Sequence, residues 1–73
     1  MKTIYGLMTN TDRTEGRGSL HVVCCAESLE VAEKVIVSKE FGKRFGIMGF
    51  PGRVENIVEM HVLETAADFR SLP

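Results

Sequence analysis

Three stretches of the chain alternate between apolar and polar residues with the two-residue period of a β-strand. Residues 3–9 and 20–26 are separated by a polar segment that contains two glycines, residues 10–19, and this arrangement predicts a hairpin with a long connection. Residues 54–64 alternate again further along the chain. The pattern therefore predicts three strands.

A helix is predicted between the second and third strands. Ser28 is suited to the N-cap position, because its side chain can accept a hydrogen bond from the first turn. Ala32, Val35 and Ile36 then fall on one face at helical spacing. We expect this helix to end near Glu40, just before a glycine.

The segment 41–53 has a composition that is unusual for a helix or a strand. It contains four glycines, three phenylalanines, one proline and three positive charges, and no acidic residue. Because glycine loses the most conformational freedom on folding, this density predicts irregular structure. Further on, Thr65 and Asp68 have the spacing of a capping box. We expect a last helical turn there, with Phe69 and Leu72 folding back on the core.

The order β-β-α-β predicts an α+β fold: a small, three-stranded, mainly antiparallel sheet with one covering helix and a short C-terminal helical turn. No repeat or linker divides the sequence, so residues 1–73 are expected to form a single domain. One helix covers only one face of the sheet, and both faces are apolar. The covered face would carry Ile4, Met8, Val22, Cys24, Val58, Met60 and Val62, or instead the opposite set, Tyr5, Leu7, Val23, Cys25, Ile57 and Leu63. The remaining face is too apolar to lie in water, which predicts a homo-oligomer.

Composition and charge narrow the class of protein. Hydrophobic residues make up 44% of the chain and charged residues 26%, which excludes a disordered chain. The net charge of −1 gives no electrostatic reason to bind nucleic acid or an anionic membrane. No apolar stretch is long enough to cross a bilayer, and the N-terminus lacks the apolar core of a signal peptide. We therefore expect a cytoplasmic protein.

Cysteine and histidine are the residues most able to carry catalysis or bind a metal. Cys24 and Cys25 are adjacent on a predicted strand, so we expect them to point to opposite faces as reduced, buried thiols. His21 lies about 13 Å along that strand from Cys25, too far for a nucleophile–base pair, whereas a cross-strand pair of His61 with Cys25 stays open. Known catalytic motifs, phosphate loops and metal-ligand spacings are absent. These absences predict a non-enzymatic protein with no metal and no cofactor.

Positive charge gathers in two predicted loops. The first carries Arg13 and Arg17, and the second carries Lys43, Arg44 and Arg53. If both loops lie at one end of the sheet, their cations and the backbone amides of the glycines would suit a phosphate or a carboxylate.

The phenylalanines of the second loop fit two interpretations. Phe45 and Phe50 could stack on the base of a bound ligand. Alternatively, the loop cations are simply solvated, and Phe41, Phe45 and Phe50 are core residues.

The opening strand Lys2-Thr3-Ile4-Tyr5, the hairpin and the helix start at residues 26–34 resemble small accessory proteins encoded by bacteriophages and other mobile elements. The resemblance covers residues 2–37. It implies a non-catalytic role, either occupying a host protein or sequestering a signalling nucleotide used in host defence.

Two functional hypotheses follow. The first is a homo-oligomeric binding protein that captures a small anionic ligand, such as a nucleotide, through its basic loops. The second is an inhibitor or adaptor that acts on a host protein through its sheet face or its aromatic loop. The residues assigned to the ligand in the first hypothesis are Arg13, Arg17, Lys43, Arg44, Phe45, Phe50 and Arg53.

Overall fold

The computed structural model describes residues 1–10, 20–46 and 49–73. The strands are β1 (Lys2–Asn10), β2 (Leu20–Ala26) and β3 (Ile57–Val62); the helices are α1 (Leu29–Ile36), α2 (Lys39–Phe45) and α3 (Ala66–Arg70); and a 3-10 turn, η2 (Val54–Asn56), precedes β3. The strand order is β2-β1-β3, and both pairings are antiparallel. The predicted α+β class and its three-stranded antiparallel sheet are therefore confirmed.

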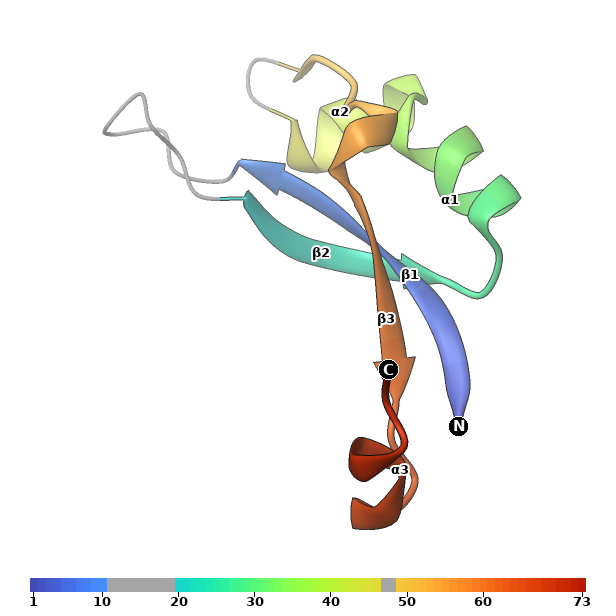
Figure 1. Ribbon diagram of the computed structural model, residues 1–73. Coiled ribbons are helices and arrows are strands. Elements are labelled where there is room, and N and C mark those ends of the chain that lie inside the picture. The colour runs from blue at the N-terminus through green and yellow to red at the C-terminus, as the bar shows by residue number, and fades with distance from the viewer. Residues whose placement is uncertain (11–19, 47–48) are drawn as a thin grey trace.

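Two helices, rather than the single one expected, cover the sheet. α1 and α2 lie together on one side of it, whereas α3 lies apart from them beyond the end of β3 (Figure 1). Among the described ranges of the chain, no helix is long and apolar enough to cross a membrane.

The core lies between the central strand β1 and the two covering helices. Leu7, in the middle of β1, is only 1% exposed and packs with Ala32 and Ile36 of α1 and with Phe41 of α2. Successive side chains of a strand point to opposite faces, so Tyr5 shares the face of Leu7. The helices therefore cover the face that carries Tyr5 and Leu7, and this packing decides between the two alternatives that the sequence left open.

The other side of the sheet has no helix over it within the described part of the chain. We call it the open face. Pairing partners and the contacts around Gly6 place on it Ile4, Gly6, Met8, Val22, Cys25, Val58, Met60 and Val62.

An irregularity in the sheet alters the expected positions of the cysteines. The β1–β2 register shifts between Leu7 and Met8, so two consecutive residues of β2, Val23 and Cys24, both pack against the core. Cys25 is then exposed on the open face. Both thiols are free, as expected, but the expectation that Cys25 is buried was wrong.

Ser38 divides the predicted long helix into α1 and α2. Its hydroxyl donates a hydrogen bond to the carbonyl of Val35 over 2.6 Å and accepts one from the amide of Phe41 over 3.2 Å. It thus ends α1 at Ile36 and caps α2. The Ser28 cap of α1 forms as predicted, accepting from the amide of Val31.

The expectation of irregular structure over residues 41–53 was wrong for its first part, which lies in α2. Phe41 and Phe45 are one turn apart on this helix, and their ring centroids are 5.4 Å apart. The loop that follows packs directly against the helix backbone at Gly42 and Gly46. A Cβ at Gly42 would lie 2.5 Å from the carbonyl oxygen of Gly49. These glycines provide room for a close backbone contact, which their number alone did not indicate.

α3 forms where the capping box predicted it, but it does not fold back on the core. The carboxylate of Asp68 accepts hydrogen bonds from the amides of Glu64 and Thr65, over 2.9 Å and 3.3 Å. Phe69 is 66% exposed, so the expectation that it packs on the core was wrong. Figure 1 shows α3 extending beyond the sheet.

The Asp68 cap predicts a pH-dependent fraying of α3. The two amide donors lower the pKa of Asp68 below its ordinary value. A lowered pKa in the folded state means that the cap contributes its full stability above the unfolded pKa of about 4, and loses it as pH falls through the folded value. We expect the amide NMR signals of Glu64 and Thr65 to move only below about pH 4.

The control for this titration is Asp68→Asn, which keeps an acceptor oxygen but has no charge to lose. Its two amide signals should stay constant over the same pH range. A wild-type midpoint at or above the ordinary aspartate value would contradict the assignment of the cap.

Candidate functional site

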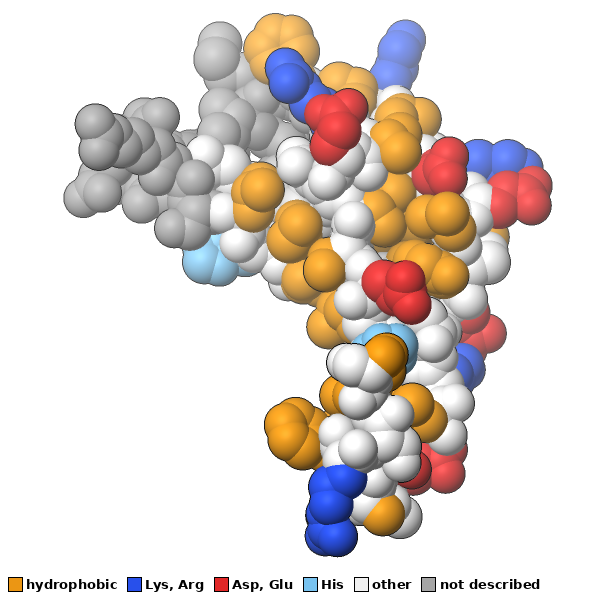
Figure 2. Space-filling view, viewed as in Figure 1, with side chains coloured by type: hydrophobic (Ala, Val, Ile, Leu, Met, Phe, Trp, Pro, Cys, Tyr) orange, Lys and Arg blue, Asp and Glu red, His pale blue; other side chains and the backbone are white. Residues whose placement is uncertain are grey.

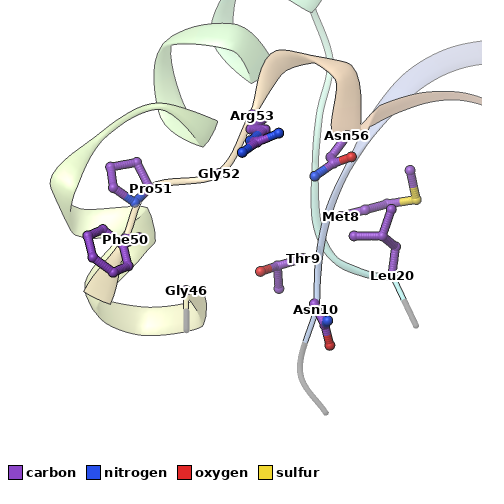
Figure 3. A pocket seen from close by; sticks show the side chains of 10 residues that line it. All are labelled: Met8, Thr9, Asn10, Leu20, Gly46, Phe50, Pro51, Gly52, Arg53 and Asn56. Atoms are coloured by element: carbon purple, nitrogen blue, oxygen red, sulfur yellow. The ribbon is translucent and has the colours of Figure 1, made fainter. Parts of the chain in front are cut away.

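The candidate site is a pocket of about 430 Å³ between the ends of β1 and β2 and the loop that follows α2. Its volume lies within the range of roughly 300–1,000 Å³ that is usual for small-molecule sites. The residues that line it are Met8, Thr9, Asn10, Leu20, Gly46, Phe50, Pro51, Gly52, Arg53 and Asn56. Figure 3 shows Phe50 and Pro51 on the loop side of this space and Thr9 on the strand side.

Three hydrogen bonds hold the walls of the pocket in place. The hydroxyl of Thr9, a buried residue of β1, donates to the carbonyl of Phe45 over 3.2 Å and so ties the sheet to α2. The amide of Gly52 donates to the carbonyl of Ile36 over 2.8 Å and ties the loop to α1. The amide of Gly46 donates to the carbonyl of Gly42 at the end of α2. Each wall is therefore anchored to the core.

Gly52 also lies against the core itself. A Cβ at this position would lie 2.7 Å from Cγ1 of Ile36 and 3.1 Å from the ring of Phe41. The lack of a side chain lets the loop backbone pass close over the core before the chain reaches Arg53.

Arg53 gives the pocket its charge. It is the one ionisable side chain among the described residues that line the pocket, and it forms no ion pair or hydrogen bond within the described part of the chain. The side-chain amide of Asn56 lies in the same pocket (Figure 3). An unpaired guanidinium offers paired donors that match a phosphate or a carboxylate.

Phe50 adds an aromatic ring to the lining of the same pocket. Phe50 is 67% exposed and lines the pocket, so the interpretation of Phe50 as a core residue was wrong. Phe45, in contrast, is half-buried and packs against the core. A lining that holds both an exposed ring and a guanidinium suits a ligand that has a flat apolar part and an anionic part.

The predicted site residues separate into two groups. Phe50 and Arg53 lie in the pocket described above. Arg44 and Phe45 line a second hollow, of about 590 Å³, between α1, α2 and β2. Lys43 is exposed in the last turn of α2 and belongs to neither lining.

Arg13 and Arg17 lie outside the described residues. The two ends of the connection that carries them, Asn10 and Leu20, both line the pocket that contains Arg53. Asn10 and Leu20 therefore meet the second loop at one end of the sheet, whereas the positions of Arg13 and Arg17 remain a prediction.

The second hollow is less suited to an anion. Its lining includes the carboxylate-bearing Glu40 as well as Arg44 and Lys34, and Lys34 is already paired with Glu30 over 3.3 Å. Cys24 also lines this hollow, and burial and then the neighbouring Cys25 raise the pKa of its thiol. A raised pKa disfavours the thiolate, so Cys24 is not an activated nucleophile.

The proposed pairing of His61 with Cys25 does not occur. His61 lies on β3, where its ring nitrogen Nδ1 is 3.5 Å from the hydroxyl of Thr3, on the face opposite the open face. Cys25 lies on β2, on the open face, and β1 separates the two strands. Over the described ranges, no group of histidine, cysteine and acidic side chains could hold a metal ion.

Comparison of this chain with protein-family models, with curated proteins and with solved structures gives no match.

Sequence reasoning missed the polar and backbone parts of the pocket. Asn56 and Thr9 fall within strand patterns, so the local sequence gives no sign that their side chains line a pocket. The one local signal was the conjunction of glycine, proline and arginine over residues 50–53, which is typical of a loop that packs closely and presents a cation. Thr9 gave no signal, because its role depends on a carbonyl 36 residues away in the sequence.

Proposed function

We propose that this protein is a non-enzymatic, homo-oligomeric binding protein that captures a small anionic ligand in the pocket beside Arg53. The observation that carries the proposal is the unpaired Arg53 guanidinium in a pocket whose described lining contains no acidic residue. A guanidinium without an internal partner contributes more binding free energy to an external anion than a paired one does. Only its hydration must be replaced, and no internal ion pair has to be broken.

A nucleotide is the ligand class that fits this chemistry best. The guanidinium of Arg53 would bind a phosphate group, Asn56 would supply an amide donor and acceptor, and the exposed ring of Phe50 would stack on a base. The resemblance of residues 2–37 to accessory proteins of mobile elements agrees with a role in sequestering a signalling nucleotide.

The first experiment is native mass spectrometry of protein purified gently from its expression host. Extra mass that disappears on denaturation would reveal a captured ligand and give its mass. The binding of a panel of ribonucleotides, with inorganic phosphate as the minimal anion, is then measured by calorimetry.

The structure supplies a matched pair of variants for this measurement. Arg53→Glu reverses the charge in the pocket, whereas Arg44→Glu makes the same change in net charge at the second hollow. We expect Arg53→Glu to weaken binding at least about tenfold and Arg44→Glu to leave it unchanged.

Two results would contradict the proposal. In the first, binding survives Arg53→Glu, or Arg44→Glu weakens it equally. In the second, the protein carries one stoichiometric host protein whose binding is insensitive to Arg53→Glu, which would favour the inhibitor or adaptor hypothesis.

A further inference from the structure

Two apolar features of the fold lack a partner within the described chain. One is the open face of the sheet, where Val22 is 41% and Val62 is 40% exposed. The other is α3, whose Phe69 is 66% exposed. Figure 2 shows hydrophobic side chains in a band over the sheet and again on the C-terminal segment at the bottom of the view. A sheet face and an amphipathic helix each normally bury their apolar side against another layer.

We infer that the occupant of the open face is the α3 helix of a second copy of this chain, in a reciprocal exchange of C-terminal helices. The inference deepens the oligomeric part of the proposed function, and it does not depend on the ligand. It names the contact that would hold the oligomer together: Phe69 of one protomer against the open face of its partner.

The size and charge of the two surfaces suit each other. Strands about 4.8 Å apart, with six paired residues at about 3.3 Å each, give a face of roughly 14 by 20 Å. This face has room for α3, which with five residues is about 7.5 Å long and about 10–12 Å in diameter. The side chains of the open face are uncharged apart from its end, where Lys2 forms an ion pair with Glu27. The one acidic and one basic residue of α3, Asp68 and Arg70, cancel each other. No like-charge repulsion opposes docking.

The connection between β3 and α3 keeps the helix away from the open face of its own chain. Only residues 63–65 join the two elements, and Asp68 fixes this connection through the amides of Glu64 and Thr65. α3 consequently extends beyond the end of β3 rather than turning back across the sheet (Figure 1). A second copy presents an open face without breaking these hydrogen bonds, as in other exchanges of a terminal element between protomers.

The small core of the chain supports the same conclusion. Four hydrophobic side chains are buried in the described structure, namely Leu7, Ala32, Ile36 and Phe41. Domains of this size are marginal when they depend on a single core, and oligomerisation is a common remedy. Docking of α3 would cover the centre of the open face around Gly6, where Val58 and Met60 of β3 lie.

The test uses the full chain, without ligand, at protein concentrations of about 1–300 µM, because interfaces of modest size often dissociate in this range. Self-association is measured by size-exclusion chromatography with light scattering and by sedimentation. The variants are Phe69→Ala, which removes the helix anchor, and Val58→Glu, which places a charge at the centre of the open face beside Gly6. Their controls are Arg70→Ala on α3 and His61→Glu, which puts the same charge on the opposite face of β3. Circular dichroism confirms that each variant is folded.

We expect the wild-type chain to form a dimer, and each test variant to raise its dissociation constant at least about thirtyfold, as loss of a central contact does. The controls should match the wild type. A mixture of Phe69→Ala and Val58→Glu should form a heterodimer, because one intact helix still meets one intact face. A wild-type monomer over the whole range would overturn the inference. So would a dimer that is indifferent to Phe69→Ala, since that result indicates direct face-to-face packing.

Discussion

Replacing Ile36 by alanine is expected to remove a large share of the free energy of unfolding of this protein. Ile36 is fully buried between Leu7 and Phe41, and its carbonyl accepts the hydrogen bond from Gly52 that anchors the pocket loop. Truncation of a buried isoleucine to alanine costs about 2–5 kcal/mol. A chain of 73 residues has a total stability of about 4–11 kcal/mol, so the loss is a large share of it.

The matched control is Val31→Ala, on the same helix. Val31 is 50% exposed, so its truncation should change the free energy of unfolding by less than about 1 kcal/mol. Urea denaturation followed by circular dichroism measures both variants. Similar losses at the two positions would contradict the assignment of Ile36 to the core.

The second large effect is expected from Gly46→Ala, which should displace the loop that forms the pocket. A Cβ at this position would lie 2.0 Å from the carbonyl oxygen of Phe50 and 2.7 Å from that of Gly42. Both obstacles are backbone atoms, so no side chain can rotate away to relieve the contact. The backbone of Gly46 has a φ of −76°, which any residue adopts, so the prediction rests on space alone.

We expect Gly46→Ala to destabilise the fold by about 2–3 kcal/mol or more. Ligand binding at the pocket should be lost, because the loop carries Phe50 and Arg53. Hydrogen exchange of the Gly52 amide should also become faster, because its bond to Ile36 depends on the position of the loop.

Gly49→Ala is the comparison variant for this experiment. Gly49 has a φ of 79° with no atom near a Cβ, so alanine there costs only the left-handed backbone strain of about 1–2 kcal/mol. If Gly46→Ala and the wild type have the same free energy of unfolding and the same exchange rate at the Gly52 amide, the loop has room to move and the prediction is wrong.

The elements that the sequence predicted correctly are those whose cause is local. The strand at residues 20–26 follows from β-branched and small apolar residues between polar segments, and the structure has β2 over the same residues. The Ser28 cap and the Asp68 cap were both predicted, because each hydrogen bond joins residues three or four positions apart.

The elements that the sequence did not predict depend on contacts with residues that are distant in the sequence. Residues 41–45 of α2 were predicted to be irregular because of the glycines of this segment, but Gly42 and Gly46 allow residues 49–51 to approach the helix backbone. The same helix separates the predicted cations, since Arg44 lines the hollow beside α1 whereas Arg53 lines the pocket beside β1. Cations that lie close together in the sequence are therefore found on two different surfaces of the fold.

Local patterns alone determined that this chain forms three strands, a capped first helix and a capped last turn, because alternation and capping are properties of neighbouring residues. Tertiary structure alone decided which sheet face is covered. Both faces are apolar, and only the packing of Leu7 against α1 and α2 distinguishes them. It also decided that the loop with Phe50 and Arg53 forms a pocket with the ends of β1 and β2, and that Phe69 stays outside the core. Both outcomes depend on how segments that are remote in the sequence pack together.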